Sequence, residues 1–599
     1  MLAACVFVFL TVTIVGAQTG GLQLLYSSAK AGPNQGWAGS ATKGAAITVW
    51  ARNVGTVRGG SYITVAGVNL TSDSDYAEWG ATTNPTTAKG FQRITFWLNG
   101  NMPAANTAGI SVTVNGITSI ALPFTIDNTG GGIFFADGTN GNDSWDGRYP
   151  DHSLGGSHGP WLHPFTVSIR TGEAPGEFIY MRNGTYTNIC NGCSDTKVAN
   201  IGYFEEGGAN CTIYNPQING TDALHYTVTS YPGELATLSG VSINAYSNYW
   251  TFTNFRMTNT GQAISLGNEW SFCSDCHMHQ TGLDVIGMMF DGPFFWVGQK
   301  FADNTRWLAN YHNSTPTCNT PTYSCSNVGT AYVLYWGSGD TTLVKDNEFH
   351  GGAMYQIHNY DENRCNATDL GRNFTNETID SNLFDITRSA GNPQDMRAAI
   401  LTGMDQNGAV YNNVTISNNV VYSRDNLVSL GMVYAFTDPG WNLTANGLYL
   451  YNNTFDAPGA PYFFTIGNSG TTAHWSNVVL QNNIAVGETQ YEIFNDSLPN
   501  FQYAFQYNLV PQTPRTNSSG TVSNNIVGAP TFVNASTQDF HLQSGSLGID
   551  QGTTLSSITV DYDGTTRPQG TAYDMGAFEY GSGTVTRPSP PTNLSAVVH

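Results

Sequence analysis

Apolar and polar positions repeat along the second half of the chain in one six-residue pattern, apolar-x-x-Asn-x-apolar. The pattern occurs six times, and its asparagines are separated by 35, 37, 34, 30 and 42 residues. Repeats of this length are typical of stacked supersecondary units that bury their apolar side chains against one another. We therefore expect strands stacked about 4.8 Å apart, with the asparagines in one row at a repeated bend. The six are Asn347, Asn382, Asn419, Asn453, Asn483 and Asn525.

The same register predicts which side chains face the interior. The apolar residue three positions before each of the first five asparagines should point inward, because side chains alternate along a strand. These residues are Val344, Ile379, Ile416, Leu450 and Leu480.

Residues 22–127 show a different pattern, with short alternating strands separated by Gly and Asn turns, which predicts a small β-sandwich. Examples are Ala46–Ala51, Ser61–Val68 and Gly109–Val114. The segment resembles IPT/TIG immunoglobulin-like domains in Ile47-Thr48-Val49-Trp50, in Asn53-Val54-Gly55 and in its closing Pro123-Phe124-Thr125-Ile126. In that family such domains are accessory spacers or binding modules.

Residues 133–580 resemble the pectate-lyase-like group of secreted right-handed parallel β-helix proteins. The resemblance rests on the turn Gly141-Asn142-Asp143-Ser144, on the strand Ile179–Tyr186, and on the closing segment Asp574-Met575-Gly576-Ala577-Phe578. It implies an all-β fold, a right-handed parallel β-helix preceded by the small immunoglobulin-like β-sandwich. The implied substrate class is an extracellular polysaccharide.

Both ends of the chain carry signals of their own. The apolar run Leu2–Val15 ends in Val15-Gly16-Ala17, which predicts a signal peptide over residues 1–17 and a secreted or cell-surface protein. A lipobox-like Leu2-Ala3-Ala4-Cys5 precedes that run instead of following it. Residues 581–599 read as a linker whose Pro588–Leu594 resembles the start of a truncated fibronectin type III domain. We expect no transmembrane segment.

Charge narrows the range of partners. Only 11 % of the residues are charged and the net charge is −21, which makes nucleic acid a poor partner. An acidic polysaccharide would need local basic residues or a bridging cation such as Ca²⁺. We expect a monomer that binds polysaccharide.

Two stacked files of polar residues are candidates for chemistry. The residues three after the asparagines, His350, Asp385, Tyr422 and Asp456, should form one outward row that either binds sugar or is an ordinary solvated face. The second file consists of the residues two positions before the asparagines. Two of them, Lys345 and Asp380, should be neighbours on adjacent turns.

Lys345, or an arginine such as Arg364 or Arg388, could be the base that a polysaccharide lyase needs, because such an enzyme removes a proton α to a uronate carboxylate. In that hypothesis Asp346, Glu348 and Asp380 hold a divalent cation that neutralises the carboxylate. The alternative is a surface ion pair, which would contribute little to stability.

The segment Met354–Arg364 is the richest in chemical groups, and a polar loop beside a rigid sheet is a common place for a site. A carboxylate pair such as Asp361 with Glu362 or Asp385 could hydrolyse a glycosidic bond, and the alternative is a solvated loop. Its candidates for catalysis are His358, Asp361 and Arg364, with Arg388 nearby, and those for binding are Gln356 and Tyr360.

An aromatic insertion, Phe290–Tyr311, includes Trp296 and Trp307, which could stack on sugar rings or pack as a local core. Cys273-Ser274-Asp275-Cys276-His277 matches a haem attachment motif, but a disulfide is a better interpretation than haem at Cys273, Cys276 and His277, or than zinc. Cys318 and Cys325 are the pair that the sequence most favours for a disulfide.

Two functions therefore compete. The first is an extracellular carbohydrate-active enzyme, a lyase ahead of a glycoside hydrolase. The second is a non-catalytic carbohydrate-binding or adhesive surface protein. A convergent set of acid and base groups would favour the enzyme, and an exposed aromatic row without one would favour the adhesin.

Overall fold

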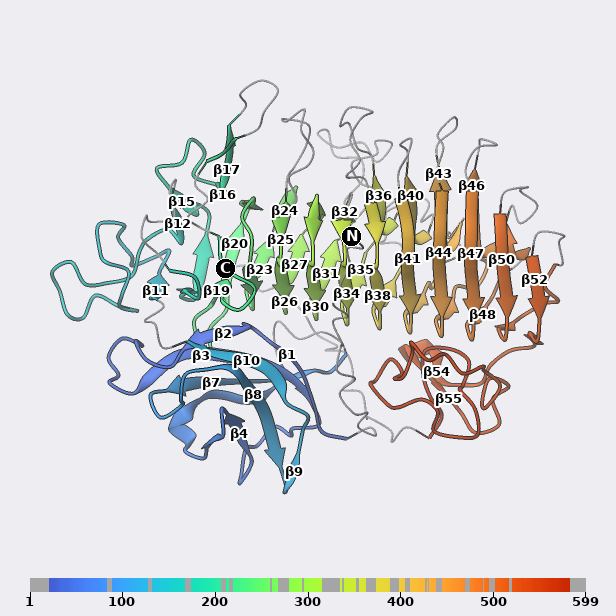
Figure 1. Ribbon diagram of the computed structural model, residues 1–599, viewed down its shortest axis with the longest axis horizontal. Helices are drawn as coiled ribbons and strands as arrows, with labels where there is room; N and C mark the ends of the chain where they lie inside the picture. Colours follow the sequence, from blue (N-terminus) through green and yellow to red (C-terminus); the bar gives the residue numbers. More distant parts are fainter. Residues whose placement is uncertain are drawn as a thin grey trace, which may run out of the picture.

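The computed structural model is all-β, as predicted, with a two-sheet sandwich followed by a long parallel β-helix (Figure 1). It describes residues 21–581, with gaps at 83–88, 128–131, 167–173, 206–211, 215–218, 259–260, 268–279, 293–295, 315–333, 337–338, 352–354, 362–372, 388–397, 405–409, 426–427, 429, 438–443, 469–473, 489, 495–500 and 516–519. No helix in these ranges is long and apolar enough to span a membrane. The terminal segments and both predicted cysteine pairs lie outside them.

An antiparallel sheet and a mixed sheet, in which β2 (Ala31–Pro33) pairs with β10 (Leu122–Asp127) in parallel, form the N-terminal sandwich, because alternate side chains of the strands are apolar and meet in one core. The first sheet has the order β1 (Gln23–Ser27), β3 (Lys43–Arg52), β7 (Gln92–Asn99), β6 (Tyr76–Ala81). The second has the order β2, β10, β8 (Ala105–Val114), β4 (Tyr62–Val65), β5 (Val68–Leu70), with β9 (Ile117–Thr118) beside β8. The 3-10 helix η1 spans Asp73–Asp75.

The solenoid has three long parallel sheets, here called sheets 1, 2 and 3 in the order in which each turn visits them. Sheet 1 contains β11 (Ile133–Ala136), β13 (Phe178–Met181), β19 (Tyr226–Ser230), β22 (Trp250–Thr253), β26 (Asp284–Ile286), β30 (Arg306–Leu308), β34 (Leu343–Lys345), β38 (Thr378–Asp380), β41 (Val410–Ser417), β44 (Thr444–Tyr451), β47 (His474–Gln481), β50 (Phe501–Gln506) and β52 (Gly520–Ser523), with β33 (Gly339–Asp340) and β37 (Asn373–Thr375) beside this path.

Sheet 2 contains β14 (Gly184–Tyr186), β20 (Ala236–Ser239), β23 (Arg256–Thr258), β27 (Met289–Gly292), β31 (Tyr311–Ser314), β35 (Glu348–His350), β39 (Leu383–Asp385), β42 (Val420–Tyr422), β45 (Thr454–Asp456), β48 (Ile484–Val486), β51 (Leu509–Val510) and β53 (Ile526–Val527). Sheet 3 contains β16 (Val198–Ile201), β21 (Ser242–Ala245), β24 (Gln262–Gly267), β28 (Trp296–Lys300), β32 (Leu334–Trp336), β36 (Tyr355–Asp361), β40 (Ala398–Met404), β43 (Gly431–Thr437), β46 (Tyr462–Asn468) and β49 (Tyr491–Phe494). Short pairs join β12 (Phe165–Thr166) to β15 (Cys190–Asn191), β17 (Tyr203–Glu205) to β18 (Thr212–Tyr214), and β25 (Gln280–Thr281) to β29 (Ala302–Asp303).

The asparagine row is confirmed at the bend between sheets 1 and 2. All of these side chains except that of Asn525, which is partly exposed, are buried, and the Oδ1 of each accepts hydrogen bonds from the backbone and side chain of the asparagine on the turn before. The row also contains Asn310, at its start, and Asn508, which lies between Asn483 and Asn525. The apolar residues three positions before the first five predicted asparagines face the core, as expected. A buried ladder of this kind fixes the register of every turn.

The sandwich packs against the outer face of sheet 1. Trp50 and Phe91 of the sandwich form one buried cluster with Ile286 and Leu308 of β26 and β30. Gly287 follows β26 at a bend with φ +60, and a Cβ there would lie 2.0 Å from the Trp50 ring. Glycine at this bend therefore permits both the left-handed backbone and the close approach of the sandwich.

A C-terminal segment, with β54 (Phe532–Asn534), the 3-10 helix η4 (Ala535–Thr537) and β55 (Asp539–Leu542), covers the later turns. Figure 1 shows it beside the sandwich, along the same side of the solenoid. Its Phe540 and Phe578 pack on Leu383 and Val420 of sheet 2. The sandwich and this segment therefore leave only part of sheet 2 accessible.

Candidate functional site

The predicted outward file exists as a stacked row. His350 of β35 lies in register with Asp385 of β39, and that residue with Tyr422 of β42. The file is not accessible along its whole length. Tyr422 is fully buried, and its ring lies 5.9 Å from that of Phe540 in the C-terminal segment. The prediction that Tyr422 binds substrate is therefore wrong, because the C-terminal segment, whose Phe540 lies 118 residues later in the sequence, covers it.

The accessible part of the row is a cluster of one imidazole between two carboxylates. His350 Nε2 lies 2.9 Å from Glu348 Oε2, and His350 Nδ1 lies 3.6 Å from Asp385 Oδ2. The side chains of His350 and Asp385 are 19 % and 22 % exposed, whereas that of Glu348 is fully buried. The strand order places all three here, because parallel pairing of β35 with β39 brings residues of successive turns into contact.

Electrostatics fix the charge of this cluster. Burial alone would lower the pKa of His350, but hydrogen bonds and the charges of Asp385 and Glu348 raise it to about 9. Burial alone would raise the pKa of Asp385, and His350 holds it below its ordinary value. Around neutral pH the cluster is therefore an imidazolium beside an ionised Asp385. No described residue donates a hydrogen bond to Glu348 Oε1, which is buried.

Neighbouring groups hold the cluster in place. The Thr387 backbone N–H donates to Asp385 Oδ1 at 3.0 Å. The Gln356 side chain donates from Nε2 to the Asp385 carbonyl at 2.6 Å and to the Gly351 carbonyl at 3.0 Å. Gln356, predicted to bind substrate, is itself fully buried and therefore supports the site from within the solenoid.

Tyr311 completes the accessible surface. Its ring centroid lies 5.2 Å from that of His350 on the adjacent turn. Burial, followed by the charges of Glu348 and Asp291, raises the pKa of Tyr311, so the phenol stays neutral. A neutral ring beside two partly exposed charged groups is a surface on which a sugar can stack and form hydrogen bonds.

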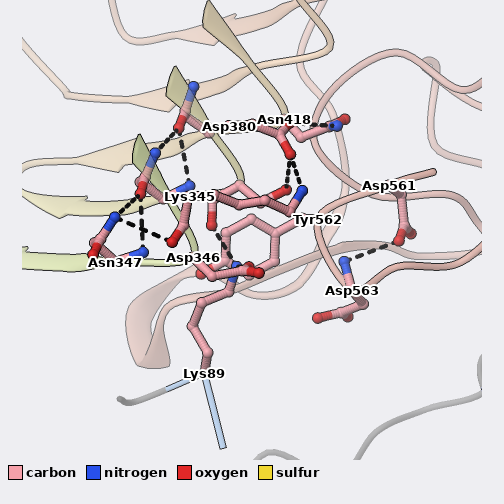
Figure 2. A network of polar contacts seen from close by, with 12 residues as sticks. Lys89, Lys345, Asp346, Asn347, Asp380, Asn418, Asp561, Tyr562 and Asp563 are labelled. Carbon is pink, nitrogen blue, oxygen red and sulfur yellow. Dashed lines mark hydrogen bonds and ion pairs between the residues drawn. The ribbon is translucent and has the colours of Figure 1, made fainter. Parts of the chain in front are cut away.

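The second predicted file lies elsewhere, at the junction of the sandwich, the solenoid and the C-terminal segment (Figure 2). Lys345 and Asp380 form an ion pair between adjacent turns, as predicted. Asp346 receives hydrogen bonds from Lys89 and Tyr26 of the sandwich. These residues join parts of the protein and do not open onto the His350 cluster.

Among the possible lyase bases, Lys345 is the one whose surroundings the structure describes, and they do not suit that role. Burial alone would lower the pKa of Lys345, but the charges of Asp380 and Asp346 raise it above its ordinary value. An amine that holds its proton so firmly is a poor base at neutral pH. The structure therefore does not support Lys345 as a catalytic residue.

The predicted cation site does not fit these residues either. The oxygens of Asp346 accept from Lys89 and Tyr26, and those of Asp380 accept from Lys345, Ser417 and two further side chains. Among the residues that the structure describes, no three His, Cys, Asp or Glu side chains gather to hold a metal ion. We derive no catalytic step through Ca²⁺.

In the described part of the aromatic insertion, Trp307 packs in a core and not on an exposed platform. Trp307 is fully buried, in register with Val344, and its indole donates to Gln299 Oε1 at 2.8 Å inside the solenoid. The binding role predicted for Trp307 is therefore wrong, because it occupies the inward position of β30. Trp296 lies in β28, but its side chain is outside the described part of the structure.

Among the remaining candidates, His358 is the one whose side chain the structure describes. His358 lies in β36 on sheet 3, where it is 3 % exposed and its ring is 6.0 Å from that of Tyr355. Tyr360 and Asp361 end the same strand, and their side chains lie outside the description. Arg364, Arg388 and the motif Cys273, Cys276 and His277 also lie outside the described residues.

No family model matches the chain, and no curated protein matches it. Among solved structures it is similar to a PL6 family alginate lyase, with 13 % identity over 71 % of this chain and 58 % of that one and a TM-score of 0.33. It thus spans less than two thirds of that lyase. The catalytic domain of a GH87 α-1,3-glucanase in complex with nigerose gives 14 % identity, 76 % and 86 % coverage and a TM-score of 0.32. The A-module of an Azotobacter vinelandii mannuronan C-5 epimerase gives 12 % identity, 59 % and 92 % coverage and a TM-score of 0.29.

Proposed function

We propose that this protein is secreted and cleaves a polysaccharide at the row formed by Tyr311, His350 and Asp385. One observation carries the proposal. The desolvated carboxylate of Glu348 and the charged carboxylate of Asp385 flank one imidazolium on an accessible stretch of sheet 2. Buried charges held in this way are costly, and such clusters gather at functional sites.

Hydrolysis of a neutral glycan fits this cluster better than elimination on an acidic one. Glu348 and Asp385 outnumber His350 in charge, and the whole chain carries −21, so a uronate chain would be repelled. His350 Nδ1 lies 3.6 Å from Asp385 Oδ2, and the proton on this nitrogen would be the one transferred to a glycosidic oxygen. Asp385, ionised, would stabilise the positive charge that develops on the sugar or activate water.

A second function, non-catalytic carbohydrate binding at a cell surface, has an observation of its own. Tyr355, Tyr434 and Phe436 lie near one another on sheet 3, with ring centroids 6.3 Å and 5.2 Å apart. Aromatic rings grouped on one sheet could bind sugar without any acid or base. The two functions therefore predict different sites on different sheets.

The test is a panel of neutral and acidic polysaccharides, assayed for new reducing ends and for the ultraviolet absorbance of unsaturated products, with and without a chelator. We expect reducing ends from a neutral glycan, unaffected by chelation. Asp385→Asn should lower kcat about 10²- to 10⁴-fold. The control is Asp222→Asn, whose carboxylate is 83 % exposed and pairs with Lys30.

Three results would contradict the proposal. Full activity of Asp385→Asn would show that cleavage does not take place at this row of residues. Unsaturated products would identify a lyase. Binding without cleavage of any glycan, lost on Tyr434→Ala, would establish the adhesive function.

A further inference from the structure

Two Lys–Asp pairs lie side by side at the junction of Figure 2, and they differ in burial. Lys89 of the sandwich pairs with Asp346 of the solenoid, and their side chains are 0 % and 5 % exposed. Lys345 pairs with Asp380 within the solenoid, and their side chains are 27 % and 12 % exposed. The first pair joins two parts of the chain 257 residues apart.

The position of Asp346 is fixed by the backbone. It occupies the bend just before the ladder residue Asn347, with a left-handed φ of 59. The next turns place Ser381 and Asn418 at the same bend, also at positive φ. A residue in this position projects away from the solenoid core, which is how its carboxylate reaches the sandwich.

The surroundings of the pair are largely closed to water. The Lys89 ammonium lies 3.7 Å from the centroid of the Tyr562 ring and 5.7 Å from that of Phe91. It also donates to the Ser381 carbonyl. Burial is the main reason that the pKa of Lys89 falls to about 8, and Arg52 and Lys345 add to the effect against the attraction of Asp346. A fraction of roughly a tenth of the amine is then neutral near pH 7.

A third group is placed to assist a reaction at the carboxyl carbon. The Tyr26 hydroxyl donates to Asp346 Oδ2, while Lys89 contacts Oδ1. Burial and the charge of Asp346 raise the pKa of Tyr26 well above its ordinary value, so it remains a hydrogen-bond donor. A donor on one oxygen and an amine beside the other is the geometry that acyl transfer requires.

We propose that Lys89 and Asp346 are joined by an amide bond that cross-links the sandwich to the solenoid. The ammonium transfers one proton to the carboxylate, giving a neutral amine and a neutral acid. The amine lone pair attacks Asp346 Cγ, and Tyr26 stabilises the oxygen that gains charge. The C–N bond forms, one C–O bond breaks, and the departing hydroxyl takes the second amine proton and leaves as water.

Formation of the amide removes the free-energy cost of keeping two charges away from water. Taking two charges out of water costs several kcal/mol per ion, which their attraction only partly offsets. An amide keeps the contact and eliminates both charges. Amide formation needs no oxidant and no added reagent.

The neighbouring pair is expected to remain ionic. The pKa of Lys345 is raised, so its amine holds its proton. The Asp380 carboxylate accepts further hydrogen bonds from Ser417 and Asn418, which stabilise its charged form. The two pairs thus form an internal comparison of a fully buried and a partly exposed ion pair.

Mass spectrometry of the denatured full-length protein tests the proposal. Trypsin cuts after unmodified lysine, so the amide should leave Lys89 uncut and yield a branched peptide. That peptide should join the segment around Lys89 to the one that begins at Asp346, at the sum of the two masses less one water. Recovery of linear peptides that end at Lys89 would overturn the proposal, as would a branch at Lys345 and Asp380.

Two variants sharpen the test. Lys345→Arg should leave the branched peptide in place. Lys89→Arg should abolish it while keeping the positive charge, and a branch that persists in this variant would overturn the assignment. If Lys89→Arg does not fold, the wild-type digest still decides the question, because it needs no variant. Neither measurement depends on glycan cleavage.

Discussion

At the scale of the residue, His350 should make stability depend on pH. Its pKa in the folded protein, about 9, lies above the ordinary value of 6.5. The imidazolium therefore stabilises the fold fully below about pH 6.5, and this contribution disappears as pH rises through about 9. We expect His350→Gln to lower the free energy of unfolding by on the order of 3 kcal/mol at pH 6 and far less at pH 10.

Chemical denaturation of both proteins across this pH range measures the effect. His474→Gln, at an exposed position of β47, is the control and should change little at any pH. A His350→Gln penalty that is equal at pH 6 and pH 10 would show that packing, and not charge, accounts for it.

Residue-level prediction from the sequence succeeded where the repeat supplied a register. The pairing of Lys345 with Asp380 and of His350 with Asp385 followed from counting positions in successive turns. The role of Lys345 could not be predicted by counting positions, because it depends on Asp346 and on Lys89. Lys89 lies 257 residues before Asp346 in the sequence. Contacts between separate parts of the chain leave no periodic signal in a sequence.

At the scale of the element, the asparagine ladder should dominate the stability of each turn. Asn419 Oδ1 accepts two hydrogen bonds from Asn382, and Nδ2 donates to the Ile379 carbonyl and to Asn453. Asn419→Ala would leave buried partners unsatisfied and should cost at least about 3 kcal/mol.

Urea unfolding compares this variant with Asn446→Ala, on the exposed face of β44, which should cost about 0.5 kcal/mol or less. Equal costs at the two positions would mean that the ladder is not the main support of the turns.

Most of the asparagine ladder could be predicted from the six-residue pattern. The two asparagines that were missed, Asn508 and Asn310, show the limits of that pattern. Asn508 has Phe505 and Val510 at the expected apolar positions, so the pattern could have revealed it inside the 42-residue interval. Asn310 could not be found this way, because the position after it that should be apolar is His312. That histidine is neutral, since burial lowers its pKa to about 3, and it stacks between Phe290 and Phe349 in the core.

At the scale of the whole molecule, the sandwich and the solenoid should unfold together. Leu308 is buried against Trp50 and Phe91, so Leu308→Asp would place a charge in an apolar interface. We expect a loss on the order of 4 kcal/mol and two calorimetric transitions in place of one. Val410→Asp, where the valine of β41 is 37 % exposed, is the control and should retain one transition. A single transition in Leu308→Asp would contradict this coupling.

Whole-molecule prediction failed where one part of the chain covers another. The sequence correctly placed Tyr422 in the outward file, yet Phe540 of the C-terminal segment covers that position. Burial by a distant segment depends on where the segment folds back, and its strands β54 and β55 pair only with each other. No stacking register connects them to the turns that they cover.

The ladder also bears on how such a chain can change over evolutionary time. Successive hydrogen-bonded asparagines are 37 residues apart at Asn310 and 17 apart at Asn508, yet their side-chain bonds measure 2.9 Å and 3.1 Å. The geometry of the asparagine ladder therefore does not depend on how many residues lie between two successive asparagines. Residues can be inserted or deleted elsewhere in a turn while the asparagine ladder stays intact, so the surface of the solenoid can change in evolution without loss of the fold.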